Sequence, residues 1–178
     1  KNGADLFLND LLETQIVSAD GRAYGLEFST HKVQGKLTGN LNYTYTISER
    51  KTTSPFAERN VRNGDYYPSN YDRPHALNAT ANLKLGQKWA LNGFFTYQTG
   101  RPITQAIGRY KVDDDDFILY SQRNAHRLPN THRMDLSFSY TPNRNQRNWK
   151  GEWTFGVYNV YGNDNVFSQF TNFYQGNA

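Results

Sequence analysis

The sequence predicts an all-β protein, an antiparallel up-and-down meander of about six to seven strands. One observation is that apolar and polar residues alternate with a period of two in several segments, as they do on half-buried strands. A second is that helical periodicity is convincing nowhere, and only residues 5–14 could form a short helix. A third is that 27 Phe, Trp and Tyr residues outnumber 26 Leu, Ile and Val residues. This composition differs from that of an ordinary water-soluble core, which consists mostly of aliphatic residues.

The predicted strands follow one another along the chain. The clearest is residues 36–48, where Leu, Gly, Tyr and Ile occupy one face and Thr, Asn and Ser the other. Phe94 interrupts the polar face of a later strand, and the register of the last strand blurs at residues 158–160. The other segments are residues 21–32, 73–85, 89–99, 133–141 and 151–161, and a seventh strand could start near Phe167.

The connections between these segments alternate in length. Residues 33–36, 86–88 and 142–150 form short connections, whereas residues 49–72 and 100–132 form connections of 24 and 33 residues. In an antiparallel meander alternate connections lie at opposite ends, so all the short turns are expected at one end and all the long loops at the other. Long loops without secondary structure are uncommon in compact domains. They are expected on outer-membrane barrels, which combine short periplasmic turns with long outside loops.

The polar face of the predicted sheet is rich in Asn, Thr, Ser and Gln. These neutral side chains suit a water-filled lumen or a surface that contacts a plug. A soluble β-sandwich also alternates, but its outer face usually carries many Lys and Glu residues. The sequence therefore favours a membrane barrel over a soluble β-sandwich that acts as a binding module, and we keep the sandwich as the less favoured alternative.

Aromatic residues on the apolar face fall at the two ends of the strands. Eight residues separate Trp89 from Tyr97, a rise of roughly 19 Å for a tilted strand, which is near the ~25 Å height of a lipid-facing band. Rings with polar tips favour the membrane–water interface, although aromatic residues also favour strands in general. The predicted aromatic girdle consists of Trp89, Tyr140 and Trp153 at the short-turn end and Tyr45, Tyr97 and Tyr161 at the long-loop end.

Six or seven strands do not make a complete membrane barrel. Single-chain barrels have an even number of strands from eight upward, and an open edge in lipid leaves backbone groups unpaired. Either several copies close one barrel, or the chain is part of a longer polypeptide. The unfinished hairpin after Tyr161 favours the longer polypeptide.

Several kinds of function have no support in the sequence. The net charge of +4 is small and scattered, so no nucleic-acid partner is expected, and the absence of Cys excludes disulfides and thiol chemistry. The longest apolar run is four residues, too short for a membrane helix. No catalytic triad or phosphate-binding loop has persuasive spacing, so we expect neither an enzyme nor a cofactor.

Metal binding has only weak candidates. The run Asp113, Asp114, Asp115 and Asp116 in the longer loop offers oxygen ligands that suit calcium, but the spacing of a calcium loop is missing and a solvated acidic loop is favoured. His126 and His132 lack an evident third ligand. We read Arg73 and His75 as structural. No metal site is therefore predicted.

Substrate contacts are expected on the two long loops. Arginine and aromatic side chains can hold sugars, peptides or anionic chelates. The alternative, which we favour, is that these side chains pack the loops against each other or against a partner that covers the mouth. The candidates are Arg59, Arg62, Tyr66, Tyr67 and Tyr71 in the first loop, with Arg109 and Tyr110 in the second.

Several motifs resemble the C-terminal barrel segment of TonB-dependent outer-membrane receptors, in the branch that carries a carboxypeptidase-regulatory-like domain. The resemblance covers residues 1 to about 167, and the order of the motifs is more specific than any one of them. The motifs are NGADLFLND (residues 2–10), GRAYGLEFS (21–29), LTGNLNYTYTISER (37–50), YPSNYDRPHALN (67–78), FTYQTGRPIT (95–104), RNAHRLPNTHRMDLSFSY (123–140) and FGVYNVYGNDN (155–165).

The resemblance implies a 22-stranded transmembrane β-barrel that holds an N-terminal plug in the bacterial outer membrane. The receptor would take up a scarce substrate, such as a siderophore, glycan or peptide, with energy that TonB, ExbB and ExbD deliver through the N-terminal part. Residues 1–178 would then be a partial C-terminal segment of the barrel, without the plug, the TonB box and the final strand. Its partners would be membrane lipid, the rest of the receptor and a surface lipoprotein lid. A barrel that docks other surface proteins without transport is the alternative.

Overall fold

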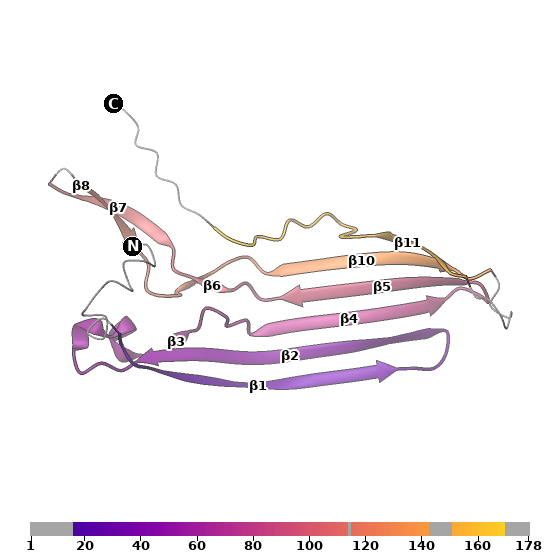
Figure 1. Ribbon diagram of the computed structural model, residues 1–178, viewed down its shortest axis with the longest axis horizontal. Helices are drawn as coiled ribbons and strands as arrows, with labels where there is room; N and C mark the ends of the chain where they lie inside the picture. Colours follow the sequence, from indigo (N-terminus) through magenta and orange to yellow (C-terminus); the bar gives the residue numbers. More distant parts are fainter. Residues whose placement is uncertain (1–15, 114, 143–150, 170–178) are drawn as a thin grey trace, which may run out of the picture. The chain divides into compact units, whose positions relative to one another are not determined.

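The main element of the protein is one antiparallel sheet. The computed structural model describes residues 16–113, 115–142 and 151–169. The strands of the sheet lie side by side in the order β1-β2-β4-β5-β10-β11 (Figure 1). They are β1 (Ala19–Lys32), β2 (Leu37–Thr52), β4 (His75–Lys84), β5 (Trp89–Gln98), β10 (Thr131–Tyr140) and β11 (Trp153–Val157). The prediction of an all-β antiparallel meander of about six strands is confirmed.

The long connections contain secondary structure of their own, which the sequence analysis did not predict. The first connection holds the 3-10 helices η1 (Ala57–Arg59) and η2 (Val61–Gly64) and the short strand β3 (Tyr67–Pro68), which pairs with β2. The second holds β6 (Pro102–Ile103), which pairs with β9 (His126–Arg127), and the hairpin of β7 (Ala106–Val112) and β8 (Asp115–Tyr120). The described part of the chain has no helix long and apolar enough to cross a membrane.

The chain divides into two units. The strand unit consists of the described residues of Tyr24–Ile47, Arg73–Arg101 and Arg127–Ala178. It therefore contains β4, β5, β10 and β11 and most of β1 and β2. The loop unit consists of the described residues of Lys1–Ala23, Ser48–Asp72 and Pro102–His126, and contains most of the two long connections.

The strand pairing brings the apolar residues of successive strands onto one face. In the row next to that of Trp89, Tyr140 and Trp153, Leu37 lies opposite Leu83, and Phe138 lies opposite Leu91 on one side and Phe155 on the other. Because side chains alternate along a strand, this register places every predicted apolar row on the same face. Three further rows in the same frame are Leu41–Ala79–Phe95–Met134, Tyr43–Leu77–Tyr97–His132 and Gly39–Ala81–Gly93–Leu136–Val157.

The last predicted strand ends earlier than expected, at Val157 instead of residue 161. Asn159 and Gly162 have positive φ angles of 53° and 62°, which turn the chain away from the strand direction. The turn is held against β10, because the Asn159 N–H donates to Asp135 Oδ1 at 2.9 Å and the Val160 N–H donates to the Met134 carbonyl at 2.8 Å. The blurred alternation at residues 158–160 is therefore the turn itself.

The remaining strand boundaries differ little from those predicted. Some predicted elements lie partly or wholly outside the described residues. β2 continues four residues past the predicted end of its strand, to Thr52, and Glu49 and Arg50 in this extension pair with β3. Residues 163–169 form no strand, so the seventh strand expected near Phe167 is not found among the described residues, and the chain beyond them lies outside the description. The short helix expected at residues 5–14 also lies outside it, as does most of the connection at 142–150.

The described residues hardly form a hydrophobic core. Tyr67 and Leu128 are the buried apolar side chains among them, at 8% and 4% exposure. On the apolar face of the strand unit, Leu26 and Phe155 are 76% and 69% exposed. Within the described residues the strand unit is a single sheet layer, whereas a soluble domain packs at least two layers around a core. The strand unit therefore leaves its apolar side chains available to another apolar phase or partner.

The pairing of β2 with β4 depends on the absence of a side chain at Gly39. A Cβ atom there would lie 2.1 Å from the Thr80 carbonyl oxygen, whereas a Cβ atom at Gly93, in the same cross-strand row, would first meet Leu136 Cδ2 at 3.4 Å. We predict that Gly39→Ala lowers the free energy of unfolding by about 1–3 kcal/mol, the usual cost of overpacking. Gly93→Ala, the matched control, should change it by less than about 0.5 kcal/mol. Thermal unfolding of the two variants checks this, and equal midpoints would contradict the close approach.

Candidate functional site

The polar face of the strand unit is hollowed. A cavity of about 650 Å³ lies over the start of β2, the middle of β4, β5 and β10 and the end of β11. Most of its lining residues belong to the polar side of the alternation, and the row between them, Gly39, Ala81, Gly93, Leu136 and Val157, lines it as well. The polar-face residues that line it include Thr38, Thr80, Asn82, Asn92, Phe94, Asp135, Ser137 and Tyr158. The polar face of the strand unit therefore has an open hollow at this level. A sheet that encloses a polar lumen is hollowed on its polar side.

A ladder of side-chain hydrogen bonds crosses this hollowed face. Asn82 on β4 donates to Asn92 on β5, and Asn92 Nδ2 donates to Ser139 Oγ on β10 at 3.1 Å. Ser139 Oγ is hydrogen-bonded in turn to Thr154 Oγ1 on β11 at 3.1 Å. Polar side chains that bond to one another across strands stabilise the register. The ladder thus links four strands through side-chain hydrogen bonds on the hollowed face.

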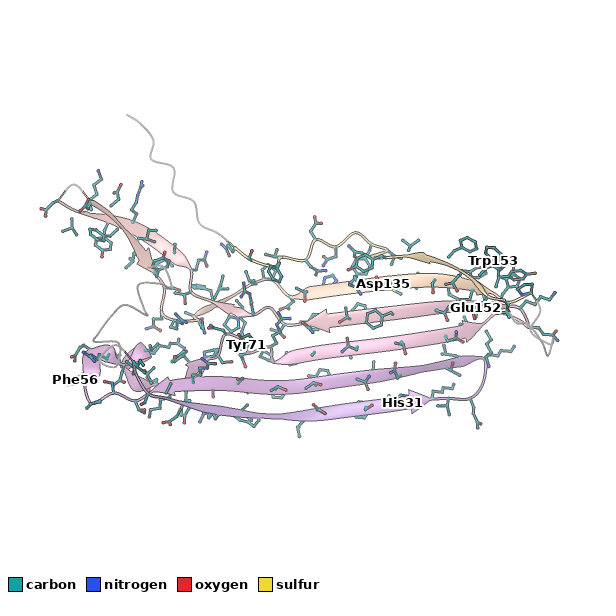
Figure 2. The ribbon with its side chains drawn as sticks, in the orientation of Figure 1. His31, Phe56, Tyr71, Asp135, Glu152 and Trp153 are labelled. Carbon is teal, nitrogen blue, oxygen red and sulfur yellow. The ribbon has the colours of Figure 1, made fainter. Side chains whose placement is uncertain are left out.

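An ion pair stands beside the cavity on the same face. Arg133 NH2 lies 3.0 Å from Asp135 Oδ2, and the guanidinium lies 4.1 Å from the centre of the Tyr158 ring and 5.9 Å from that of Phe94. Figure 2 shows Asp135 on β10. The contact with Arg133 explains why Phe94 can occupy a polar position, because a cation is attracted to the face of an aromatic ring.

The aromatic residues predicted at the short-turn end gather on the apolar face. The rings of Trp89 and Tyr140 lie 4.2 Å apart, and those of Trp89 and Phe138 lie 4.9 Å apart. Trp153 is the strand partner of Tyr140 and is 63% exposed (Figure 2). The predicted residues of this end therefore lie in one cross-strand row of the apolar face, with Trp89 and Trp153 exposed and Tyr140 half-buried.

The aromatic residues predicted at the long-loop end pair with polar side chains. The Tyr45 ring lies 5.2 Å from the His75 ring, and Tyr97 Oη accepts from Asn130 Nδ2 at 2.8 Å. Tyr161 lies in the turn after β11, and its hydroxyl is hydrogen-bonded to His132 Nδ1 at 2.8 Å. The two histidines belong to this aromatic row, a feature that the sequence analysis missed, although both follow the same period of two as the tyrosines.

The tyrosines proposed for substrate binding in the first long connection differ widely in exposure. The Arg22 guanidinium lies 3.7 Å from the centre of the Tyr66 ring, and Lys51 Nζ lies 5.8 Å from it. Tyr67 is 8% exposed, so its ring packs inside the loop unit and is not available to a substrate. Tyr71 is 82% exposed and is the tyrosine of the three that solvent reaches most freely (Figure 2).

The arginines proposed for substrate binding contact their own surroundings. Arg59 lies 5.1 Å from the Phe56 ring centre. Arg62 Nε donates to Gln122 Oε1 at 3.2 Å and so joins the first connection to the second. Arg109 NH1 lies 3.8 Å from Asp116 Oδ2, and the Tyr110 ring stacks on Phe117 at 5.6 Å. The seven candidates thus lie in one unit, the loop unit.

The segment before β4 is fastened to β2 by a buried carboxylate that the sequence analysis did not single out. Asp72 is 3% exposed, and its Oδ1 accepts the Ser48 N–H at 2.7 Å. The Ser69 N–H donates to the Ser48 carbonyl at 2.9 Å, and the two serine hydroxyls lie 2.9 Å apart. These bonds give the YPSNYD segment a structural role. In the sequence, the only indication of this role was the presence of an Asp in the motif.

The acidic run lies at the tip of the β7–β8 hairpin. Asp113 has a positive φ of 54°, Asp115 and Asp116 belong to β8, and Asp114 lies outside the described residues. Within residues 16–113, 115–142 and 151–169, no three His, Asp or Glu side chains are close enough together to hold a metal ion. The tip is therefore a charged turn, and the ion pair between Arg109 and Asp116 joins its two strands.

Asp72 is buried and Tyr71 is exposed, so substitutions at these two neighbouring residues should affect stability differently. Asp72→Ala leaves the Ser48 N–H without its acceptor and should lower the free energy of unfolding by about 1–3 kcal/mol. Tyr71→Ala removes an exposed ring and should change it by less than about 0.5 kcal/mol. Denaturant unfolding of both variants measures the difference. A larger effect at Tyr71 would show that its ring is covered in the folded protein.

Comparisons with known proteins gave no indication of function, so a proposal has to rest on the sequence and on the geometry of the described residues. Neither protein-family models, nor curated proteins, nor solved structures gave a match to this chain.

Proposed function

We propose that this chain forms part of the wall and outer loops of a TonB-dependent outer-membrane receptor, which takes up a scarce substrate such as a siderophore, glycan or peptide. The strand unit would be the barrel wall, and the two long connections would contact the substrate or a covering partner. The remaining strands and the plug would come from the rest of the receptor. TonB, ExbB and ExbD would supply the energy.

The observation that carries the proposal is the difference between the two faces of the strand unit. One face exposes large apolar side chains, including Leu26, Phe155 and Trp153, at 63–76%. The opposite face is hollowed and hydrogen-bonded through amides and hydroxyls. In water the exposed apolar face would be unfavourable by about 25 cal/mol for each Å². In a bilayer the same face contacts hydrocarbon, while the hollowed face borders water or a plug.

The distribution of aromatic residues supports the same orientation. Trp89, Tyr140 and Trp153 gather at one end of the apolar face, and Tyr45 and Tyr97 lie at the other, next to His75 and Asn130. Rings with a polar tip are favourable where hydrocarbon meets headgroups. β1 and β11 are the edge strands of the described sheet, and within a bilayer their outer edges need strand partners, which the proposal assigns to the rest of the barrel.

A barrel that docks other surface proteins without transport is a second candidate, favoured by the β7–β8 hairpin. Seven large apolar or aromatic residues of this hairpin are 38–58% exposed, and two-stranded hairpins are marginally stable alone in water. Large exposed apolar patches often mark protein interfaces. The exposed residues are Ile107, Tyr110, Val112, Phe117, Ile118, Leu119 and Tyr120.

We predict that the protein sediments with outer membranes and needs detergent for extraction. Leu136 lies midway between His132 and Tyr140 on the apolar face, and Ser137 lies next to it on the hollowed face. An arginine at the middle of a lipid-facing strand costs about 2–4 kcal/mol, whereas lumen positions tolerate charge. Leu136→Arg should therefore sharply reduce folded protein in the outer-membrane fraction, and Ser137→Arg should leave most of it. Fractionation followed by immunoblotting measures both.

Two outcomes of that experiment argue against the membrane assignment. Recovery of the wild-type protein as a detergent-free soluble monomer would exclude a barrel wall. Equal loss of membrane-bound protein in the two arginine variants would mean that the two faces meet similar surroundings.

Energy dependence separates the transporter from the docking barrel. We expect that cells without the protein grow more slowly on at least one scarce nutrient or iron source, and that cells without TonB show the same defect even when the protein is present. Growth across a panel of defined sources, with the receptor gene and the TonB gene deleted singly and together, measures this. A receptor-dependent phenotype that persists unchanged without TonB would favour the docking barrel.

A further inference from the structure

The two long connections meet at one buried side chain in the loop unit. Asn124 is 6% exposed, and its Nδ2 donates to the Pro68 carbonyl at 2.7 Å and to Asn70 Oδ1 at 2.8 Å. Its own N–H donates to Thr104 Oγ1 at 3.1 Å. One residue of the second connection is thus bonded to two residues of the first and to the start of the β7–β8 hairpin.

Asparagine is the side chain that this position requires. The φ angle of 54° lies in the left-handed region, where Gly, Asn and Asp are tolerated best. Two acceptors face the side chain, and an amide NH₂ group supplies two donors, whereas a carboxylate supplies none. Glycine fits the backbone without the donors, and aspartate fits the backbone with the wrong charge.

The bonds at Asn124 lie close to the base of the β7–β8 hairpin and help to fix where the hairpin lies. The base of the hairpin is closed by two bonds, from the Ser121 N–H to the Gln105 carbonyl at 2.8 Å and from the Gln105 N–H to Ser121 Oγ at 3.0 Å. Arg62 adds a further bond between the connections through Gln122. The hairpin that carries Arg109 and Tyr110 is therefore held at its base against the connection that carries Tyr66 and Tyr71.

We infer that Asn124 is a positioning residue that couples the two long connections, so that the candidate binding residues on both move as one body. Its use in substrate binding rests on the proposed function, but the coupling itself does not. Loss of the Asn124 side chain should loosen both connections, including residues 64–72, which are distant from it in sequence.

Amide hydrogen exchange of the purified protein tests the coupling. In Asn124→Gly and Asn124→Asp, peptides from residues 64–72 and from residues 102–112 should exchange about tenfold faster, because local opening costs less once side-chain bonds between the connections are lost. Asn63→Gly is the matched control: Asn63 also has a positive φ, 57°, and this change leaves the bonds of Asn124 and Arg62 intact. Faster exchange confined to the second connection would overturn the inference.

A reversible cross-link distinguishes coupling from a general loss of stability. The sequence has no cysteine, so Asn70→Cys with Asn124→Cys introduces the only possible disulfide. The oxidised double variant should exchange as slowly as the wild type in both connections, and the reduced form should match Asn124→Gly. If the oxidised form, once its cross-link is verified by mass spectrometry, does not slow exchange at residues 64–72, the inference is overturned. Membrane fractionation of the same proteins tests the proposed function separately.

Discussion

Alternation of side chains on a strand is the constraint on which the strand unit depends. A register shift of one residue would bring apolar side chains to the hollowed face and amides to the exposed one. The observed pairings keep Leu37, Leu83, Leu91 and Phe138 in one row, and all the other apolar rows follow from that frame. With hardly any buried core among the described residues, stability depends on backbone pairing, on the polar ladder and on whatever covers the apolar face.

Each face is stabilised by a different kind of interaction. The apolar face offers contact area and ring stacking, as between Trp89 and Tyr140, whereas the hollowed face offers hydrogen bonds, as between Asn92 and Ser139. Close backbone approach adds a third requirement, seen at Gly39 and again at Gly100, where a Cβ atom would lie 1.7 Å from the Leu128 carbonyl oxygen. A sheet with one apolar and one polar face suits a barrel wall that separates hydrocarbon from water better than it suits a domain surrounded by water. This difference between the faces is the physical basis of the proposed receptor function.

The sequence predicted what depends on periodicity and left unpredicted what depends on contacts between distant residues. The strands and both faces followed from alternation, and the aromatic clusters of Trp89 with Tyr140 and of Tyr45 with His75 lie where strand ends were expected. Asp72 and Asn124 gave no such signal, because the side chain of each bonds to residues at least 24 positions away. The hairpin at residues 106–120 was missed because its alternation is irregular and both of its faces expose apolar side chains.

Closure of the hairpin at Gln105 and Ser121 has a consequence for how this region can change in evolution. The described bonds that join the base of the hairpin to the rest of the loop unit lie at or below that pair, at Gln122, Asn124 and Thr104. If both strands of the hairpin gain or lose two residues beyond this pair, the hairpin becomes longer or shorter, but each remaining side chain keeps its face. Related proteins can therefore differ in the length of this hairpin while the bonds at its base stay the same.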